Sequence, residues 1–315
     1  MKENELDYAK NLALNVVEEV SKIVIGRRNE VYLLLTSLIS GGHVLIEGVP
    51  GVAKTLLAKA FAYTLDLDYK RIQFTPDLLP SDITGTYIFD QRSKDFVFRK
   101  GPIFTNILLA DEINRASPKT QSALLEAMQE QQVTVEGHTF DLPRPFMVIA
   151  TLNPIETEGV FPLPEAQLDR FMMKIVLDYP SPKEELEILH RQILIHKWLI
   201  NKVASREDIF NLQRLFWDIH VSEAVERYII ELVMFTRKHK YVKLGASPRA
   251  TVHLYLASKA YALLMGRDYV LPDDVKKLAI PILSHRIILT PDALYNGVRG
   301  EEVVKDILNK ITVPA

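Results

Sequence analysis

Cysteine is absent from the sequence, and this absence excludes several classes of chemistry at once. Disulfides, iron–sulfur clusters, thiolate zinc sites and a cysteine nucleophile all require that residue. An excess of one charge is missing too, because 38 lysines and arginines are balanced by 40 aspartates and glutamates to give a net charge of −2. The chain therefore lacks the overall positive charge that is typical of nucleic-acid-binding proteins, although the sequence does not exclude local basic patches.

Long hydrophobic runs are also lacking. An apolar run at residues 229–235 carries a glutamate and falls short of the ~20 residues that span a bilayer. The first ten residues, MKENELDYAK, are polar and acidic, unlike a signal peptide. These features predict a soluble, cytoplasmic protein with no membrane insertion.

Short apolar runs recur along the first 180 residues. Those near residues 43, 70, 107, 147 and 172 are typical of strands, and helical patterns lie between them. Strands that alternate with helices predict a parallel five-stranded sheet of the α/β class. Two further segments, near residues 83–100 and 132–142, have polar centres and predict β-hairpins inserted between core elements.

The composition shifts after residue 180. Helix starts follow one another at Ser181, Ser205, Ser222, Ser247, Pro272 and Thr290, while strand patterns nearly disappear. With 315 residues the chain exceeds one average domain. We therefore predict an α/β domain over residues 1–195 and an all-helical domain over residues 196–315.

The stretch GVPGVAKT, residues 48–55, connects a predicted strand to a predicted helix. A glycine-bearing loop in that context is typical of a phosphate-binding loop, because glycine lets the backbone approach phosphate oxygens and the helix start offers free N–H groups. Lys54 would reach the β- and γ-phosphates, and Thr55 would give its hydroxyl to Mg²⁺. An ordinary strand–turn–helix connection is the alternative.

One residue of this loop departs from the usual pattern. Ala53 stands where a glycine commonly precedes the lysine. The additional methyl group is tolerable if Ala53 already has helical backbone angles.

A second stretch, ILLADE at residues 107–112, ends in two carboxylates. Its continuous apolar run suits a strand buried on both faces of a parallel sheet, and ligands bind at the carboxyl ends of such strands. Asp111 would hold Mg²⁺ through water, and Glu112 would polarise the attacking water. Buried strands often end in an acid, but the combination with a phosphate loop indicates ATP hydrolysis.

Three further features stay open at this level. Val24 and Ile25, upstream of the loop, either sandwich a base or belong to the core. Arg249 lies in a first helical turn, where its charge opposes the helix dipole, so it either serves an anion or is a harmless surface residue. The mildly basic hairpin near residues 83–100 has either a solvated tip or a ligand-binding one.

Together, these motifs resemble those of an AAA+ ATPase. More narrowly, the runs LIEGVPGVAKTLLAKA, LLADEINRASPKTQSALLEAMQE and EGVFPLPEAQLDRF resemble the MoxR family, and alanine before the loop lysine is a habit of that family. The resemblance covers essentially the whole chain. It implies a parallel five-stranded P-loop AAA+ core followed by an all-helical lid domain.

The resemblance also implies a role for each matching residue. Glu112 would activate water, Asn153 would be the first sensor, and Arg170 would be an arginine finger that reaches a neighbouring subunit. Arg249 would be the second sensor, acting in its own subunit or across the interface. Asn114 and Arg115 fit the pattern without a firm role. ATP would be bound by Val24, Ile25, Gly26, Gly48, Val49, Pro50, Gly51, Val52, Ala53, Lys54, Thr55 and Leu56, and Mg²⁺ by Thr55 and Asp111.

The implied function is that of an ATPase ring, usually of six subunits, which acts as a chaperone on a separate protein. Such partners often carry a von Willebrand A domain and serve metal insertion or complex maturation. A nucleic-acid-translocating motor is the main alternative, and the balanced charge disfavours it. A nucleotide-switched scaffold and a metal chelatase subunit are further alternatives. The eight histidines show no metal-ligand spacing that would favour the latter.

Overall fold

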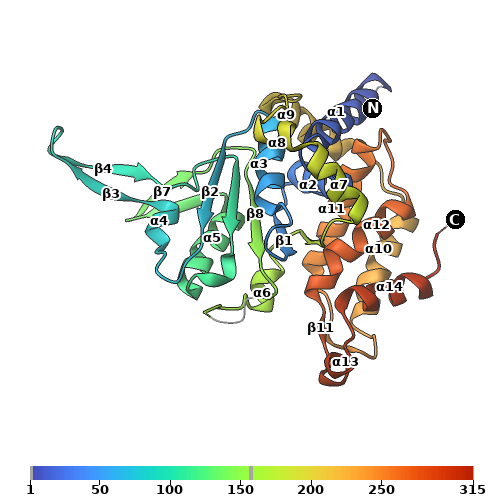
Figure 1. The fold of residues 1–315 in the computed structure, drawn as a ribbon. Helices are drawn as coiled ribbons and strands as arrows, with labels where there is room; N and C mark the ends of the chain where they lie inside the picture. The colour runs from blue at the N-terminus through green and yellow to red at the C-terminus, as the bar shows by residue number, and fades with distance from the viewer. Residues whose placement is uncertain (1–2, 156–158, 315) are drawn as a thin grey trace.

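A parallel sheet lies at the centre of the first half of the chain in the computed structural model, which describes residues 3–155 and 159–314 (Figure 1). Its strand order is β2-β5-β8-β1-β9, and every pairing is parallel. The predicted five-stranded parallel sheet is therefore confirmed. The strands are β1 (Val44–Gly48), β2 (Tyr69–Gln73), β5 (Ile107–Asp111), β8 (Met147–Leu152) and β9 (Met173–Leu177).

Alternation along the strands creates an apolar layer on each face of the sheet. On β1, Val44 and Ile46 belong to the layer with α1, α2 and α3, whereas Leu45 belongs to the layer with α5. Helices on both faces bury the side chains of β5 and β8, as an all-parallel sheet requires. The helices are α1 (Glu3–Ser21), α2 (Arg28–Ile39), α3 (Lys54–Thr64), α5 (Pro118–Glu130) and the short α6 (Glu165–Leu168).

Two β-hairpins extend the α/β domain, as the sequence predicts. Phe98 of the first stacks on Phe140 of the second, with ring centroids 4.2 Å apart. The outer part of the first hairpin projects away from the body of the molecule (Figure 1). A short helix, α4 (Pro80–Thr84), precedes it. The hairpin strands are β3 (Gly85–Asp90) with β4 (Asp95–Lys100), and β6 (Gln132–Val135) with β7 (His138–Asp141).

The second half of the chain is helical, as predicted, while the domain boundary between residues 195 and 196 stays a prediction. Ser181, Ser205, Ser222 and Thr290 each accept a backbone N–H with the side chain and so begin α7, α9, α10 and α13. A short antiparallel ladder of β10 and β11 is added to the helices. The elements are α7 (Pro182–His190), α8 (Gln192–His196), α9 (Arg206–Leu215), η2 (Phe216–Asp218), α10 (Glu223–Thr236), β10 (Val242–Leu244), α11 (Pro248–Leu264), α12 (Pro272–Leu283), η3 (Ser284–Arg286), β11 (Ile288–Leu289), α13 (Pro291–Tyr295) and α14 (Gly300–Lys310).

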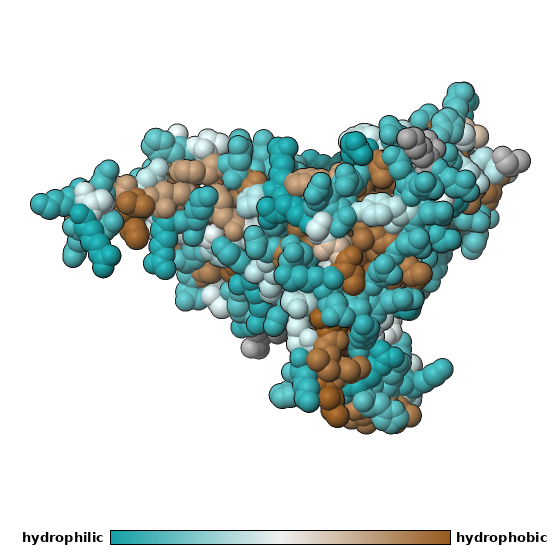
Figure 2. Space-filling view, turned by 90° about the horizontal axis from the view of Figure 1, so that it is seen from above, coloured by the Kyte–Doolittle hydropathy of each residue, from teal (hydrophilic) through white to brown (hydrophobic). Residues whose placement is uncertain are grey.

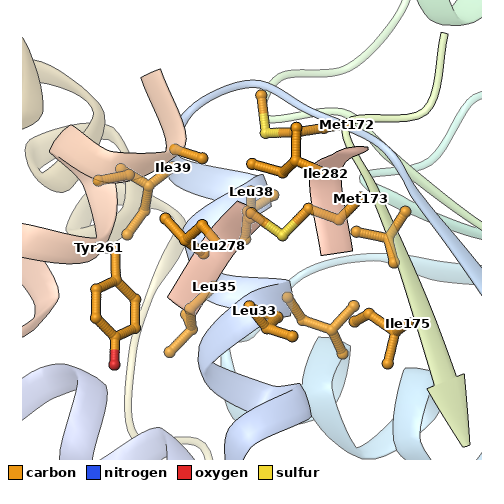
Figure 3. Close-up of a cluster of buried hydrophobic side chains, with 14 of the residues drawn as sticks. Leu33, Leu35, Leu38, Ile39, Met172, Met173, Ile175, Tyr261, Leu278 and Ile282 are labelled. Carbon is orange, nitrogen blue, oxygen red and sulfur yellow. The ribbon is translucent and has the colours of Figure 1, made fainter. Parts of the chain in front are cut away.

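The two halves share one apolar interior. Figure 3 shows Leu35 and Leu38 of α2 beside Leu278 and Ile282 of α12, with Met173 of β9 close by. Burying a side chain of this size stabilises the fold by about 1.5–3 kcal/mol, so the lid is packed firmly against the sheet domain. Among the described residues, no helix is both long enough and apolar enough to cross a membrane.

The backbone at Ala53 does not have the helical angles that would make its methyl group tolerable. Ala53 has φ 65° and ψ 25°, in the left-handed region, and it immediately precedes α3 instead of belonging to it. In that region the Cβ of an L-residue crowds the following carbonyl oxygen, at a cost of roughly 1–2 kcal/mol. The condition under which the additional methyl group would be tolerated is therefore not met. The loop keeps a conformation that suits glycine while it carries a methyl group.

Replacing Ala53 with glycine should relieve this strain. We expect Ala53→Gly to raise the free energy of unfolding of the ligand-free protein by about 1 kcal/mol. The matched control is Ala123→Gly inside α5, where the same exchange should lower the free energy of unfolding by about 1 kcal/mol. Urea denaturation followed by circular dichroism measures both changes. Equal destabilisation by the two substitutions would contradict the strain at Ala53.

Candidate functional site

The loop after β1 folds back over the end of its own strand. Gly51 has φ +85°, which glycine adopts without strain. Gly48 is required for a different reason, since a Cβ there would lie 2.9 Å from the backbone oxygen of Leu177. Lys54 Nζ donates to the backbone oxygens of Gly48, at 2.6 Å, and Leu152, at 3.2 Å. The ammonium group therefore lies where β1 and β8 end side by side.

The carboxylate of Asp111 lies beside this loop. Thr55 Oγ1 donates to Asp111 Oδ2 at 3.3 Å, and Thr151 Oγ1 of β8 donates to Asp111 Oδ1 at 2.6 Å. A hydroxyl and a carboxylate are hard oxygen donors, which suit Mg²⁺ because this ion keeps several waters and takes few protein ligands. The residues present therefore fit the metal that the loop motif implies.

Two residues of β2 that the sequence analysis did not single out complete the cluster. Arg71 donates to Asp111 Oδ2 from Nε, at 3.0 Å, and from Nη2, at 2.7 Å. Gln73 Nε2 donates to Glu112 Oε2 at 2.6 Å. Their signal in the sequence is their spacing, because side chains two residues apart on a strand share a face. The register that sets Gln73 beside Asp111 becomes visible only when β2 is known to pair with β5.

Glu112 leaves the strand at a strained backbone position. Its φ of 56° and ψ of 51° are left-handed, a conformation that persists only where the surroundings enforce it. Its N–H donates to Thr151 Oγ1 at 2.8 Å, and its Oε2 also accepts from Arg115 Nη1 at 2.9 Å. Thr151 thus bonds to both residues, but the two carboxylates accept from different side chains.

Asn153 follows β8, the strand that lies between β5 and β1. Its side chain is buried, and its Oδ1 accepts from the Ile155 N–H at 3.3 Å. The strand order therefore brings Asn153 between the loop and the acid pair, as the resemblance implies. Asn114, in η1 (Ile113–Arg115), is also buried. Glu158, the first residue of the third family-like run, lies outside the described residues.

A small cavity of about 130 Å³ adjoins the phosphate loop. Val24 and Ile25 line it together with Leu56. Gly26 instead faces a neighbouring cleft, where a Cβ would lie 2.0 Å from Glu184 Oε1. The cavity suits a flat apolar base. Several of its lining residues were not predicted from the sequence. The full lining is Ile23, Val24, Ile25, Arg27, Gly51, Val52, Ala53, Leu56, Pro180, Ile188 and Ile195.

Arg170 lies away from this cluster. It precedes β9, and the Met172 N–H donates to the oxygen of His43, just before β1, whereas the phosphate loop follows the other end of β1. The four steps from Val44 to Gly48 separate those two edges of the sheet by about 13 Å. The Arg170 side chain makes no hydrogen bond or ion pair with any residue that the structure describes.

Arg249 is joined to the same segment as Arg170. Its Nη1 donates to Asp169 Oδ2 at 3.0 Å. Ser247 Oγ lies 3.0 Å from each oxygen of that carboxylate, and Arg286 Nε donates to Oδ1 at 2.8 Å. The sequence analysis missed Asp169 and Arg286, since neither carries a distinguishing local pattern. The structure thus brings Arg249 to the segment around Arg170 and not to the phosphate loop.

Both halves of the chain match known protein families. Residues 43–173 match the family described as ATPase family associated with various cellular activities (AAA), and residues 234–307 match the AAA lid domain. A candidate ATPase from Cytophaga hutchinsonii, known as a crystal structure, is 45% identical, with a TM-score of 0.92 over 99% of this chain and 98% of its own.

Two named relatives identify the family within the AAA ATPases more specifically. Chaperone MoxR1 from Mycobacterium tuberculosis is 46% identical over 305 residues, which cover 94% of this chain and 81% of the relative. Protein MoxR from Paracoccus denitrificans is 32% identical over 85% of this chain and 86% of its own length. This chain therefore belongs to the MoxR family of AAA+ ATPases.

Proposed function

We propose that this chain is a Mg²⁺-dependent ATPase whose sites are completed between the subunits of a ring, and that it uses ATP to remodel a separate protein. The supporting observation is that the charged residues of the candidate site lie at two opposite edges of the sheet. Lys54, Asp111 and Glu112 share one edge of the sheet, whereas Arg170 belongs to the other edge and has no partner among the described residues. A site with this division needs a second subunit.

The residues near the loop would bind and neutralise the nucleotide. Lys54 would exchange its bonds to backbone oxygens for the β- and γ-phosphates. Thr55 and Asp111 would hold Mg²⁺, which supplies charge neutralisation between those phosphates when it is bound. Arg71, which occupies Asp111 Oδ2 in the ligand-free protein, would have to yield part of that contact.

Glu112 and Asn153 would act on the attacking water. Glu112 is held by Gln73 and Arg115, so its carboxylate is positioned but must shift to accept a proton from water. Asn153, buried between the loop and the acids, would orient that water against the γ-phosphate. Separate side-chain partners for Asp111 and Glu112 allow one acid to serve the metal while the other serves the water.

Arg170 and Arg249 would act together in the site of the neighbouring subunit. Both flank Asp169, and a guanidinium aimed at the transferring phosphoryl group stabilises the charge of its transition state. A closed ring of like subunits, six by analogy with the family, provides every site with one such pair. The alternative in which Arg249 serves its own subunit is disfavoured by its bond to Asp169.

The projecting hairpin favours a protein as the remodelled partner. Ile88, Phe89, Phe96 and Val97 expose 42%, 55%, 64% and 46% of their surfaces. Figure 2 shows a small brown apolar patch on the projection, behind a mainly teal tip. Exposed apolar patches of this kind mark protein contacts. The same hairpin also carries Arg92, Lys94, Arg99 and Lys100, which a phosphate backbone would contact. A DNA-translocating motor would instead show salt-sensitive DNA binding and DNA-stimulated turnover.

The partner would be a separate chain. A von Willebrand A domain protein, matured or loaded with a metal, is the partner class that the family resemblance favours. Faster ATP turnover on addition of such a protein would support it, and no response across a panel of these proteins would count against it.

Exchanging the water-activating acid should separate binding from hydrolysis. We expect Glu112→Gln to keep ATP affinity within about threefold and to lower kcat by at least about 100-fold, because the amide cannot take a proton. Nucleotide titration and phosphate release, measured over a range of protein concentrations, check both values. Ordinary turnover in Glu112→Gln would refute this role. In the wild type, turnover per subunit that rises with concentration would support shared sites.

Removing the finger should leave binding intact as well. We expect Arg170→Ala to bind ATP normally and to lose about 1,000-fold in kcat, the scale of an arginine finger. The control is Arg227→Ala, an exposed arginine of α10 paired with Glu223 along its helix, which should change neither value. Unchanged turnover in Arg170→Ala would remove it as the finger.

A further inference from the structure

One buried arginine of the lid holds the backbone on both sides of Arg170. Arg286 Nη2 donates to the carbonyl oxygens of Asp169, at 3.1 Å, and Phe171, at 2.6 Å. Its Nη1 donates to the carbonyl oxygen of Met172 at 3.2 Å. The side chain of Arg286 is 1% exposed. Because a guanidinium presents its donors in a rigid plane, these bonds fix how the segment is oriented as well as where it lies.

The carboxylate of Asp169 faces the same lid. Ser247, Arg249 and Arg286 all donate to it, at distances from 2.8 to 3.0 Å. Burial lowers the pKa of Arg286 to about 10, and the adjacent Asp169 opposes that shift, so the guanidinium stays charged at neutral pH. Asp169 is therefore the counter-charge of a buried cation and the residue directly before the finger.

Ser247 is used in an unusual way. It occupies the position before α11, where a serine hydroxyl commonly accepts a backbone N–H of the helix, as Ser205 and Ser222 do for α9 and α10. Ser247 makes no such capping bond, and its hydroxyl donates to Asp169 instead. The Ser247 hydroxyl therefore stabilises the segment that carries Arg170 and does not stabilise the start of α11. Such departures from ordinary helix capping often accompany function.

The lid also borders the phosphate loop of its own subunit. A cleft of about 770 Å³ lies between them, with Gly48 and Val49 of the loop on one side and Arg299 and Glu301, at the start of α14, on the other. The lid therefore adjoins both the nucleotide loop and the segment of residues 169–172, which lie at opposite ends of β1 and β9.

We propose that Asp169 is a positioning residue through which the lid of one subunit sets Arg170 for the site of the next. This inference rests on the proposed trans role of Arg170. Any displacement of the lid carries Ser247, Arg249 and Arg286 with it, and their bonds transmit that displacement to the finger. The state of one nucleotide site then controls hydrolysis in its neighbour.

A mild variant tests the contact without leaving a buried charge unpaired. We expect Ser247→Ala to lower kcat about tenfold with KM for ATP unchanged, because misplacing a catalytic group reduces turnover and not nucleotide affinity. The matched control is Ser222→Ala, which removes a serine at another helix start of the same lid and should leave kcat unchanged. Unchanged kcat in Ser247→Ala, or an equal loss in both variants, would overturn the inference.

Mixed rings provide the sharper test. Asp169→Asn subunits keep their acids but would present a misplaced finger, whereas Glu112→Gln subunits keep their finger but lack the acid. Each should be nearly inactive alone. Co-expressed in equal amounts, they should regain about a quarter of the wild-type rate per subunit, because half of the intact acids meet an intact finger. A defect confined to the folding of the Asp169→Asn subunit would not be rescued by its neighbour.

Arg170→Ala mixed with Glu112→Gln separates this inference from the function on which it rests. Recovery in that mixture without recovery in the Asp169→Asn mixture would overturn the role of Asp169 and leave the trans finger intact. Failure of both mixtures would overturn the trans finger as well. If Asp169→Asn does not fold, Ser247→Ala takes its place in the mixture, with the same expected recovery.

Discussion

The parallel register of the sheet is the constraint on which the whole site depends. Because all five strands run the same way, every residue that directly follows a strand lies at one edge. The order β2-β5-β8-β1-β9 then sets Arg71, Asp111, Asn153 and Lys54 in neighbouring positions, although they are far apart in sequence. The same register puts the start of β9, and with it Arg170, at the opposite edge. The parallel register therefore brings the residues near the phosphate loop together and places Arg170 at the opposite edge of the sheet.

Side-chain hydrogen bonds and strained backbone angles are concentrated at the edge of the sheet that carries the phosphate loop. Thr151 bonds to both consecutive acids, while Arg71 bonds to Asp111 and Gln73 bonds to Glu112. Left-handed backbone at Ala53 and Glu112 costs free energy that the packed sheet and helices offset. Local rules are broken on both sides of the phosphate-binding region, which is where a functional site is expected to depart from ideal geometry.

The lid is positioned by two kinds of interaction with different consequences. Apolar contacts of α11 and α12 with α2 and β9 supply most of the binding between the halves, but such contacts are non-directional. The buried pair of Asp169 and Arg286 adds direction, since its bonds require one orientation of the segment. Desolvation makes a buried pair weak evidence for stability, so its value in this fold lies in orientation.

Local patterns in the sequence were sufficient for the five strands, both hairpins and the helix starts at the capping serines, and they placed the loop of residues 48–55 and the acids Asp111 and Glu112 at strand ends. Propensity, period and motif spacing act over a few residues, which is why these features could be predicted. Local patterns were insufficient for Arg71, Gln73 and Arg286, whose partners lie on other elements and follow from strand order and lid packing. The backbone angles of Ala53 could not be read from local patterns either, because the loop that closes onto β1 and β9 imposes them, while an isolated alanine prefers ordinary helical angles. The sequence by itself determined which chemistry is present, and only the tertiary structure decided which residues meet, because the register between strands and the docking of the lid are long-range.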